Sequence, residues 1–591
     1  MNTKKLFCLL LCLLLTLPIF AGCRLGAGVD DGSDSASEEQ SSSEELGADT
    51  EIDPDFLQVV TEGISVDIIF PKPASSGILA FVNDLTDTLH RLGCTEVNAI
   101  DEIDTYDPAR IEIVIGRTGY AESNSVFDSL CYGQGTICVS GNKLIIAAYD
   151  DDIYSTMAPK LALALKSGKD DQGNVKIARD YSITTSKNAL VSSIPVLEGL
   201  PLNDVKDGGD NSYVLTFKNA TAADLDGYLD ILKQNGYEEY AKNTIEKNVY
   251  YTLINDDYVM TVMLTDYNDE LKVIIEKRSG TTLPTRESDN VWTPVDGVTT
   301  TISQLGLYYE YEGKNDYFNG MSYVIRLADG SFILIDGGHD KPIDADRLYN
   351  VMRKQAPDPD NIVIAAWFFT HDHGDHTGFF TSFSERYASK VTVEQFVYNF
   401  PAVTDVKDGT GKVGGNIRVY FRSSEVIKAH PGQQLFIRNA KINILYTNDL
   451  WEYKKQPLKT HNEASLVFTV ELEGKKLMIL GDYYDDRGIL RNLYSSETLK
   501  SDIMQVSHHG ISNCGTLLYP IIAPEWVLWP LGTDYVEEYD RVISEHPINA
   551  YMKSMDQDKV LMAKDDIVIL TVKDGNITSQ VFENDAEYLA S

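Results

Sequence analysis

Six consecutive residues concentrate side chains that bind metal ions. His371-Asp372-His373-Gly374-Asp375-His376 holds three of the chain's ten histidines and two carboxylates. Imidazole and carboxylate together suit zinc, manganese or iron. On a tight turn, His371 and His373 can face one ion while Asp375 and His376 face a second. Two ions about 3.5–4 Å apart can hold a hydroxide between them and stabilise a reacting phosphoryl or carbonyl centre.

Buried strands must position such a cluster. The apolar run from Ile362 to Phe369 predicts a strand that ends where the cluster begins. Other apolar runs are also followed by polar residues: Leu334-Ile335 by Asp336, Leu477 to Leu480 by Asp482, Val506 by His508 and His509, and Trp526 to Pro530 by His546. Hairpins are predicted over Met321 to Ile335, with a type I′ turn at Asp329-Gly330, and over Leu466 to Leu480. Hairpins interleaved with helices favour two sheets covered by helices.

The spacing His371-x-His373-x-Asp375-His376 resembles the signature of the metallo-β-lactamase superfamily, and further matches follow in the family's order. The resemblance implies an α/β fold class, with an αββα sandwich in the C-terminal half and two divalent metals, zinc first and manganese or iron as alternatives. It makes Asp375 a metal ligand with a catalytic role. Asp336 resembles the family's aspartate that orients ligands without binding metal. Asp482 resembles the aspartate that bridges both metals.

Val506-Ser507-His508-His509-Gly510 resembles a branch that includes competence-type DNA-uptake hydrolases and phosphorylcholine esterases. One histidine of the pair would complete the second metal, and we expect His509 as the ligand and His508 as a catalytic auxiliary. Ser544-Glu545-His546-Pro547 resembles the branch's final histidine–proline, at the mouth of the site. His546 is therefore expected to contact substrate or assist proton transfer, unless it is an ordinary loop histidine.

The chain departs from the family between the signature and the bridging aspartate, where many members supply a lone histidine. His430 lies in a turn-like Ala-His-Pro-Gly context and is expected to be exposed. His461 precedes an Asn-x-x-Ser-Leu-Val element that resembles the same branch, in which an asparagine occupies the region. His461 is thus either a ligand of the first metal or its neighbour. His339 is expected near the site or on the surface.

The first residues predict a targeting segment. Lys4 and Lys5 precede an apolar stretch, Leu6 to Phe20, that is too short to span a bilayer comfortably. Phe20-Ala21-Gly22-Cys23 resembles the lipobox of bacterial lipoproteins, which implies a signal peptide over 1–22 and membrane anchoring through lipid on Cys23. The alternative is an ordinary secretory signal. Residues 23–55 are acidic and serine-rich, and predict a flexible tether. Both alternatives place the protein outside the cytoplasm.

Charge and cysteine content limit the partners. The formal net charge of −38 repels phosphate backbones and argues against long nucleic acid as the substrate. After the signal and Cys23, Cys94, Cys131, Cys138 and Cys514 remain, too few for a disulfide framework, although Cys131 and Cys138 could pair. The sequence does not indicate an oligomeric state.

Two small domains precede the catalytic region. Strands and helices alternate over 56–190, which predicts a small α/β domain without a catalytic constellation. Residues 195–280 predict a strand, a helix and three further strands, an α+β unit with a structural or docking role. A linker over 281–297 leads to the catalytic domain, 298–585.

The expected function is that of an extracytoplasmic metal-dependent hydrolase. The branch favours a phosphodiesterase or phosphoesterase, and surface location and acidity favour a small or cell-envelope phosphoester. Metal-bound water would supply the attacking hydroxide. Trp451, Tyr453, Tyr483 and Tyr484 could cage a quaternary ammonium group or simply pack. A competence-type nuclease and a non-catalytic, metal-containing binding lipoprotein are the alternatives.

Overall fold

The structure is a computed structural model. It describes residues 53–61, 65–101, 106–107, 109–307, 310–311, 314–315, 319–403, 405–453, 455–485, 487–511, 515–531, 550–563 and 566–591. The chain divides into two units, Met1–Pro54 and Asp55–Ser591, and every element below belongs to the second unit. The predicted signal, Cys23, most of the tether, Cys514 and His546 lie outside the described residues. Within them, no helix is both long and apolar enough to cross a membrane.

The N-terminal module is a mixed sheet flanked by helices. Its strands are β2 (Val66–Phe70), β3 (Val97–Asp101), β4 (Glu112–Ile115), β5 (Gln134–Ser140), β6 (Lys143–Ala148) and β8 (Ser182–Ser186), in the order β3-β2-β4-β6-β5-β8. Its helices are α1 (Ser76–Leu92), α2 (Ala121–Asp128) and α3 (Asp151–Ser167), and β1 (Phe56–Val60) pairs separately with β7 (Val175–Ala178). Ser75 caps α1, which ends at Gly93 in the left-handed conformation. Cys131 and Cys138 are free thiols, so the pairing considered for them is absent.

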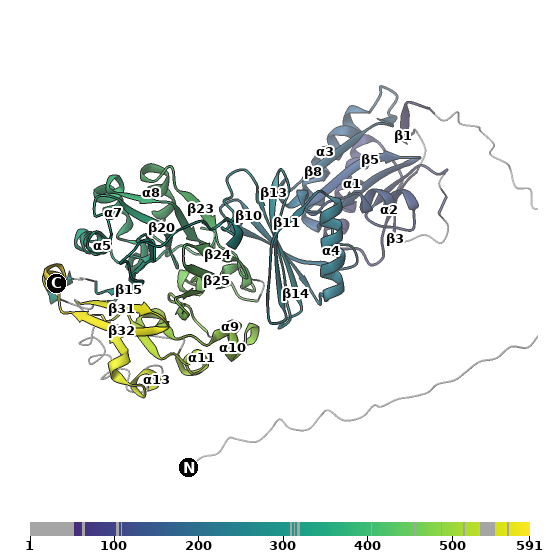
Figure 1. Ribbon diagram of the computed structural model, residues 1–591. Helices are drawn as coiled ribbons and strands as arrows, with labels where there is room; N and C mark the ends of the chain where they lie inside the picture. The colour runs from purple at the N-terminus through teal and green to yellow at the C-terminus, as the bar shows by residue number, and fades with distance from the viewer. Residues whose placement is uncertain are drawn as a thin grey trace, which may run out of the picture. The chain divides into compact units, whose positions relative to one another are not determined.

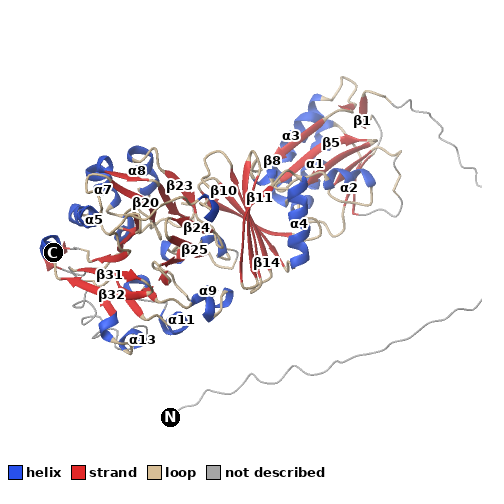
Figure 2. Ribbon diagram, in the orientation of Figure 1, coloured by secondary structure: helices blue, strands red, loops and turns tan. Residues whose placement is uncertain are grey.

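The middle module is an antiparallel sheet with helix α4 (Ala222–Gln234) on one face (Figures 1 and 2). Its strands are β9 (Leu202–Gly209), β10 (Ser212–Lys218), β11 (Glu238–Ile245), β12 (Asn248–Ile254), β13 (Tyr258–Thr265) and β14 (Glu270–Lys277), in the order β11-β12-β13-β14-β10-β9. The sequence therefore missed β9 and β11, which are mostly polar. Thr221 and Asp224 form the capping box that begins α4.

Strand β14 is buried on both faces, because alternate side chains point to opposite sides. Leu271, Val273 and Ile275 join the core under α4. Ile274 joins a core with Tyr446 and Tyr494 of the C-terminal domain. The middle module and the C-terminal domain are thus packed as one body.

Polar groups fix this junction as well. His430 is 1% exposed and lies between two carboxylates, 2.8 Å from Asp449 Oδ2 and 3.2 Å from Glu276 Oε2 of β14. The expectation that His430 is exposed is therefore wrong, because the middle module covers its turn. Lys272 Nζ donates to the carbonyl of Asp449 at 2.8 Å. Lys428 Nζ donates to the carbonyls of Gly208 and Gly209 and to Ser212 Oγ.

The C-terminal domain contains two sheets packed face to face. The first has the order β23-β22-β20-β19-β18-β15-β31-β32, with β21 beside β20. Its strands are β15 (Thr301–Leu305), β18 (Ser322–Arg326), β19 (Phe332–Asp336), β20 (Ile362–Phe368), β21 (Val391–Val393), β22 (Gln395–Tyr398), β23 (Glu425–Lys428), β31 (Ile567–Lys573) and β32 (Asn576–Phe582). A small pair, β16 (Glu310–Tyr311) and β17 (Lys314–Asn315), lies apart.

The second sheet runs in the order β24-β25-β26-β27-β28-β29-β30. Its strands are β24 (Gln434–Ile437), β25 (Ala440–Tyr446), β26 (Val467–Leu472), β27 (Lys475–Ile479), β28 (Ile503–Gln505), β29 (Trp526–Trp529) and β30 (Val560–Met562). Both predicted hairpins form, as β18–β19 and β26–β27. Only Gly330 has a positive φ at the first turn, so the predicted type I′ turn, which requires two such residues, is wrong there.

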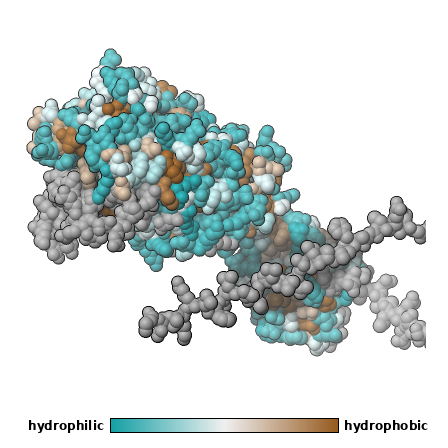
Figure 3. Space-filling view, turned by 90° about the horizontal axis from the view of Figure 1, so that it is seen from below, coloured by the Kyte–Doolittle hydropathy of each residue, from teal (hydrophilic) through white to brown (hydrophobic). Residues whose placement is uncertain are grey.

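Helices cover the outer face of each sheet, as the sequence predicted. α5 (Pro342–Gln355), α7 (Phe380–Tyr387), α8 (Val413–Tyr420) and α14 (Asp585–Ala590) pack on the first sheet or at its edge, and α9 (Ile489–Leu493), α10 (Ser496–Leu499), α11 (Gly515–Ile522) and α13 (Ala550–Lys553) belong to the second. An apolar core lies between the sheets. Hydrophilic side chains dominate the face seen in Figure 3, where apolar ones form small separate spots.

We expect His430→Gln to weaken the junction in a pH-dependent way. Burial opposes the charged imidazole, but Asp449 and Glu276 outweigh it and raise the pKa of His430 to about 9. The contribution of charged His430 to the free energy of unfolding is therefore full below its unfolded pKa of about 6.5. It is lost as pH rises through the folded pKa of about 9. The substitution should lower the free energy of unfolding by ~3 kcal/mol at pH 6 and by less at pH 10, in urea titrations followed by fluorescence.

His90→Gln is the matched control, because His90 is exposed on α1. It should leave the unfolding midpoint nearly unchanged at both pH values. An equal effect of His430→Gln at pH 6 and pH 10 would contradict a charged His430.

Candidate metal centre

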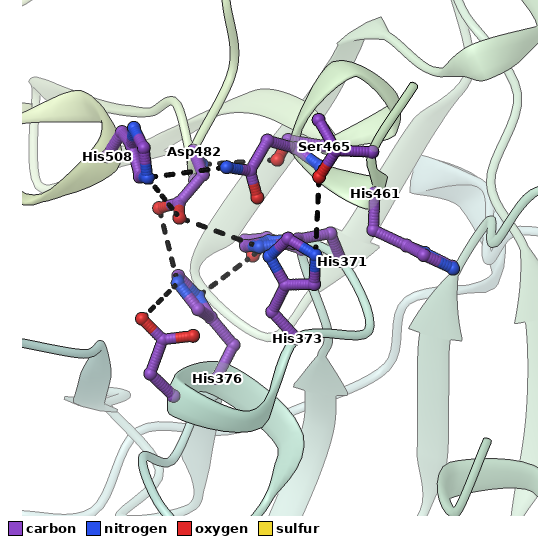
Figure 4. A network of polar contacts seen from close by, with 12 residues as sticks. His371, His373, His376, His461, Ser465, Asp482 and His508 are labelled. Carbon is purple, nitrogen blue, oxygen red and sulfur yellow. Dashed lines mark hydrogen bonds and ion pairs between the residues drawn. The ribbon is translucent and has the colours of Figure 1, made fainter. Parts of the chain in front are cut away.

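Four strand ends deliver the polar side chains to one edge of the sandwich. β19 ends at Asp336, and β20 leads to His371, His373 and the short helix α6 (Gly374–Thr377). β27 leads to Asp482, and β28 to the single turn η6 (Ser507–Gly510) that carries His508 and His509. Figure 4 shows that His371, His373, His376 and His508 gather around Asp482.

Two groups of candidate ligands share one carboxylate. In the His371 group, ligand atoms of His371, His373 and Asp482 lie within 4.8 Å of one another. In the His376 group, the same holds for Asp375, His376, Asp482 and His509. Asp482 belongs to both groups, so its carboxylate could serve an ion held by either group. Of the histidine pair, His509 enters a group and His508 does not.

Three of these histidines have one nitrogen held and the other open. Nδ1 of His376 lies 2.7 Å from Asp336 Oδ2, Nδ1 of His371 lies 3.1 Å from Thr370 Oγ1, and Nδ1 of His509 lies 3.2 Å from the amide nitrogen of Gly320. Asp336 also accepts from the amide and hydroxyl of Thr370. These contacts fix the orientation of the rings, as the groups behind metal ligands do.

The open atoms are those that a metal would need. Nε2 of His371, His376 and His509, and Oδ1 of Asp482, are buried and have no hydrogen-bond partner within the described part of the chain. Nε2 of His376 is 3.2 Å from Asp482 Oδ1, and Nε2 of His371 is 3.6 Å from Asp482 Oδ2. Convergent, unpartnered donor atoms of this kind fit divalent cations.

The electrostatics agree with that fit. Burial alone opposes charge on each group, but the nearby imidazoles hold the pKa of Asp375 and Asp482 below the usual range. Burial likewise opposes charge on His376 and His509, yet the carboxylates raise the pKa of both, that of His509 to about 9. Burial and neighbouring His376 lower the pKa of His371. Positively charged groups beside these two carboxylates thus favour their anionic form.

Backbone geometry at two turns brings the second sheet's residues to the site. His508 and His509 have φ values of 47° and 53°, in the left-handed region that non-glycine residues rarely adopt. Gly481 has φ 55°, and its amide donates to Gln505 Oε1 at 2.8 Å, while the amide of Asp482 donates to Ser465 Oγ at 3.1 Å. Strained residues of this kind persist where the surrounding structure holds them.

His508 lies at the rim of the centre. Its side chain is 20% exposed, and its Nε2 is 3.7 Å from Asp482 Oδ2 and 3.3 Å from Nδ2 of Asn462. Nδ2 of Asn462 also donates to the hydroxyl of Tyr484 at 2.9 Å. His508 therefore has access both to the carboxylate that both groups share and to solvent.

The remaining sequence candidates lie at varying distances from the centre. His461 belongs to neither group, and its ring centroid is 6.0 Å from that of His373, so it is a neighbour in this structure. His339 Nε2 contacts the carbonyl of Asn319 at 2.7 Å, beside the site. Of the aromatic residues that could form a cage or simply pack, Tyr483 is buried against Tyr446, and Tyr484 contacts His508.

Sequence reasoning missed Asp408 and Gln505, and it gave no role to Ser465 of the Asn-x-x-Ser-Leu-Val element. Asp408 Oδ2 lies 2.9 Å from Nε2 of His373. It follows no apolar run, and no spacing connects it with the signature, so no sequence signal could have identified it. Gln505 is the last residue of β28 and precedes the histidine pair, a position that could have suggested a supporting role.

The comparisons with known proteins concern the C-terminal half. Residues 315–513 match the family model of the metallo-beta-lactamase superfamily. Among curated proteins, nothing matches. The metallo-beta-lactamase fold protein YhfI from Bacillus subtilis is 13% identical, with 39% of this chain and 85% of YhfI covered and a TM-score of 0.26.

Two further solved structures show similarly low identity. MEM-A1, a subclass B3 metallo-beta-lactamase from a soil metagenome library, is 14% identical, with 37% of this chain and 82% of that chain covered and a TM-score of 0.22. CmlA, a diiron beta-hydroxylase from Streptomyces venezuelae, is 10% identical, with 48% and 54% covered and a TM-score of 0.28. The predicted α/β fold class is confirmed, and residues 315–513 form a domain of the metallo-β-lactamase superfamily.

Proposed function

We propose that the protein is an extracytoplasmic, metal-dependent phosphodiesterase or phosphoesterase that acts on a small or cell-envelope substrate. One observation carries the proposal: two groups of buried and half-buried ligands share Asp482, and their open donor atoms converge. Members of this superfamily are mostly hydrolases, and some are oxygenases. The His508-His509-Gly510 motif, which resembles the phosphoesterase branch, supports the choice of a phosphoester.

The residues of the chain have distinct tasks in this proposal. The His371 group and the His376 group would hold one divalent cation each, zinc first, with manganese and iron as alternatives. When bound, such cations lower the pKa of water and polarise a phosphoryl centre. Asp336 and Thr370 keep the open nitrogens of His376 and His371 directed at the centre.

The rim of the site has groups that suit a phosphoester. Asn462, Tyr484 and His508 form a hydrogen-bonded set beside Asp482. Amide, hydroxyl and imidazole groups can donate to phosphoryl oxygens. His508, which has access to solvent, can transfer a proton to the leaving oxygen. The formal charge of −38 favours a small or envelope phosphoester over DNA.

Asp482→Asn should remove the activity together with the metals. We expect two equivalents of metal in the wild-type protein by elemental analysis, and at least ~100-fold slower hydrolysis of bis-p-nitrophenyl phosphate and p-nitrophenyl phosphorylcholine in the variant. Asp360→Asn, on an exposed turn, makes the same charge change and should behave as wild type. The proposal is contradicted if the wild-type protein binds no metal and hydrolyses neither ester in excess Zn²⁺ or Mn²⁺.

Linear DNA should be cleaved far more slowly than the small esters. DNA cleavage as fast as hydrolysis of bis-p-nitrophenyl phosphate would favour a nuclease. Asp482→Asn protein that folds, lacks metal and retains binding of a partner would favour a non-catalytic lipoprotein.

His508→Gln should separate proton transfer from metal binding. We expect kcat to fall by roughly 10²–10⁴ for esters with a poor leaving group, and much less for p-nitrophenyl esters, because a good leaving group needs no proton. Metal content should stay at the wild-type value. A loss of metal as large as in Asp482→Asn would instead make His508 a ligand.

We also propose a lipid anchor on Cys23. The wild-type protein should fractionate with membranes and incorporate labelled palmitate, whereas Cys23→Ser should lose the label and the membrane association. A Cys23→Ser protein that remains in the membrane fraction would point to anchoring by an uncleaved signal.

A further inference from the structure

Asp408 is a carboxylate close to the centre that belongs to neither ligand group. It lies in the loop between β22 and α8, and its Oδ2 is 2.9 Å from Nε2 of His373. Its other oxygen, Oδ1, accepts a hydrogen bond from the amide of His461 at 3.2 Å. Thr460 Oγ1 lies 3.4 Å from the same nitrogen of His373. Asp408 thus connects a histidine of the signature with the segment around His461.

The loop that carries Asp408 is fixed on both sides. After Asp408, two groups donate to the carboxylate of Asp372: the hydroxyl of Thr410 at 2.6 Å and the amide of Gly411 at 2.7 Å. Before it, Asp405 forms an ion pair with Lys206 of strand β9 in the middle module. Gly409 packs closely between His461 and Asp372. A Cβ atom there would lie only 2.7 Å from His461 Nε2 and 2.8 Å from Asp372 Oδ2, so the position has no room for a side chain.

His373 differs from the other histidines in which nitrogen is held. His371 and His376 have an Nδ1 held by an oxygen and an open Nε2. In His373, Nε2 is held by Asp408, so Nδ1 is the nitrogen left for a cation. A carboxylate that accepts from Nε2–H places the proton there and leaves the lone pair on Nδ1.

We propose that Asp408 is the positioning residue of the His371 group: it fixes the tautomer and orientation of His373 and strengthens Nδ1 as a donor. The inference rests on the proposed function, because it requires a metal in that group. The His371 group has three residues where the His376 group has four. His461 lies outside both groups and adds no ligand to the His371 group. A stronger donor on His373 therefore offsets part of the difference in ligand number between the two groups.

Metal affinity tests the proposal without reference to activity. Metal-free, full-length protein is titrated with Zn²⁺ against a chromophoric chelator, for the wild type, Asp408→Asn, Asp408→Ala and Asp408→Glu. Asp408→Asn and Asp408→Ala should weaken one of the two metal equivalents by ~10–100-fold and leave the other unchanged. Asp408→Glu keeps the carboxylate and should recover part of the loss.

Asp340→Asn is the matched control. Asp340 is exposed and forms an ion pair at 3.1 Å with Lys412, which follows Asp408 in the loop before α8. Asp340 belongs to neither ligand group. This variant should bind both equivalents as the wild type does. Thermal unfolding of the metal-free proteins shows whether each variant folds, and Asp408→Asn should melt within a few degrees of the wild type.

The possible outcomes separate this inference from the proposed function. Wild-type affinity for both equivalents in Asp408→Asn and Asp408→Ala overturns the role of Asp408 and leaves the proposed function intact. An equal loss of both equivalents, or a markedly lower melting temperature of the metal-free variants, also overturns it, because it shows a general structural role. A wild-type protein that binds no zinc contradicts the proposed function itself.

Discussion

Buried negative charge is the constraint around which the C-terminal domain is built. Asp336 and Asp482 are at most 1% exposed, and Asp375 lies beside Asp482 in the His376 group. Isolated buried carboxylates are costly, so each must be paired, hydrogen-bonded or bound to a cation. Asp336 meets this requirement with Thr370 and His376, while Asp375 and Asp482 face histidines whose open nitrogens also lack partners. The hydrogen-bonded network at this edge is therefore incomplete, and its open atoms are those that divalent cations could bind.

That constraint explains the local geometry around it. Strands of two sheets must end at the same edge to bring the three ligand-bearing segments together, and the turns after them are tightly held. The left-handed backbone of His508 and His509 shapes the turn after β28. Gln505 holds the turn after β27, because its side-chain oxygen accepts from the buried amides of Leu480 and Gly481. Strained turns and buried carboxylates destabilise the folded domain. The apolar core between the sheets offsets that cost.

Sequence patterns revealed the ligands but few of the contacts that support them. Histidine spacing and strand ends are local properties, so His371, Asp336, Asp482 and the pair at 508 and 509 could be identified, and both hairpins of the domain were found. The burial of His430 depends on Glu276, a residue of another module, and the contact of Asp408 with His373 depends on a loop path. Neither leaves a periodic signal. β9 and β11 were missed because their exposed edges are polar and do not alternate clearly.

Strand β14 has a consequence for how this protein can change in evolution. One of its faces belongs to the helix of its own module, and the other is shared with Tyr446 and Tyr494 of the C-terminal domain. A gene fragment that encodes the C-terminal domain alone would place these tyrosines, and the His430–Asp449 pair, in contact with water. The smallest unit that recombination can move intact therefore includes the middle module. The candidate metal centre and the middle module are inherited together, and substitutions on either side of their interface must be compatible with the other side.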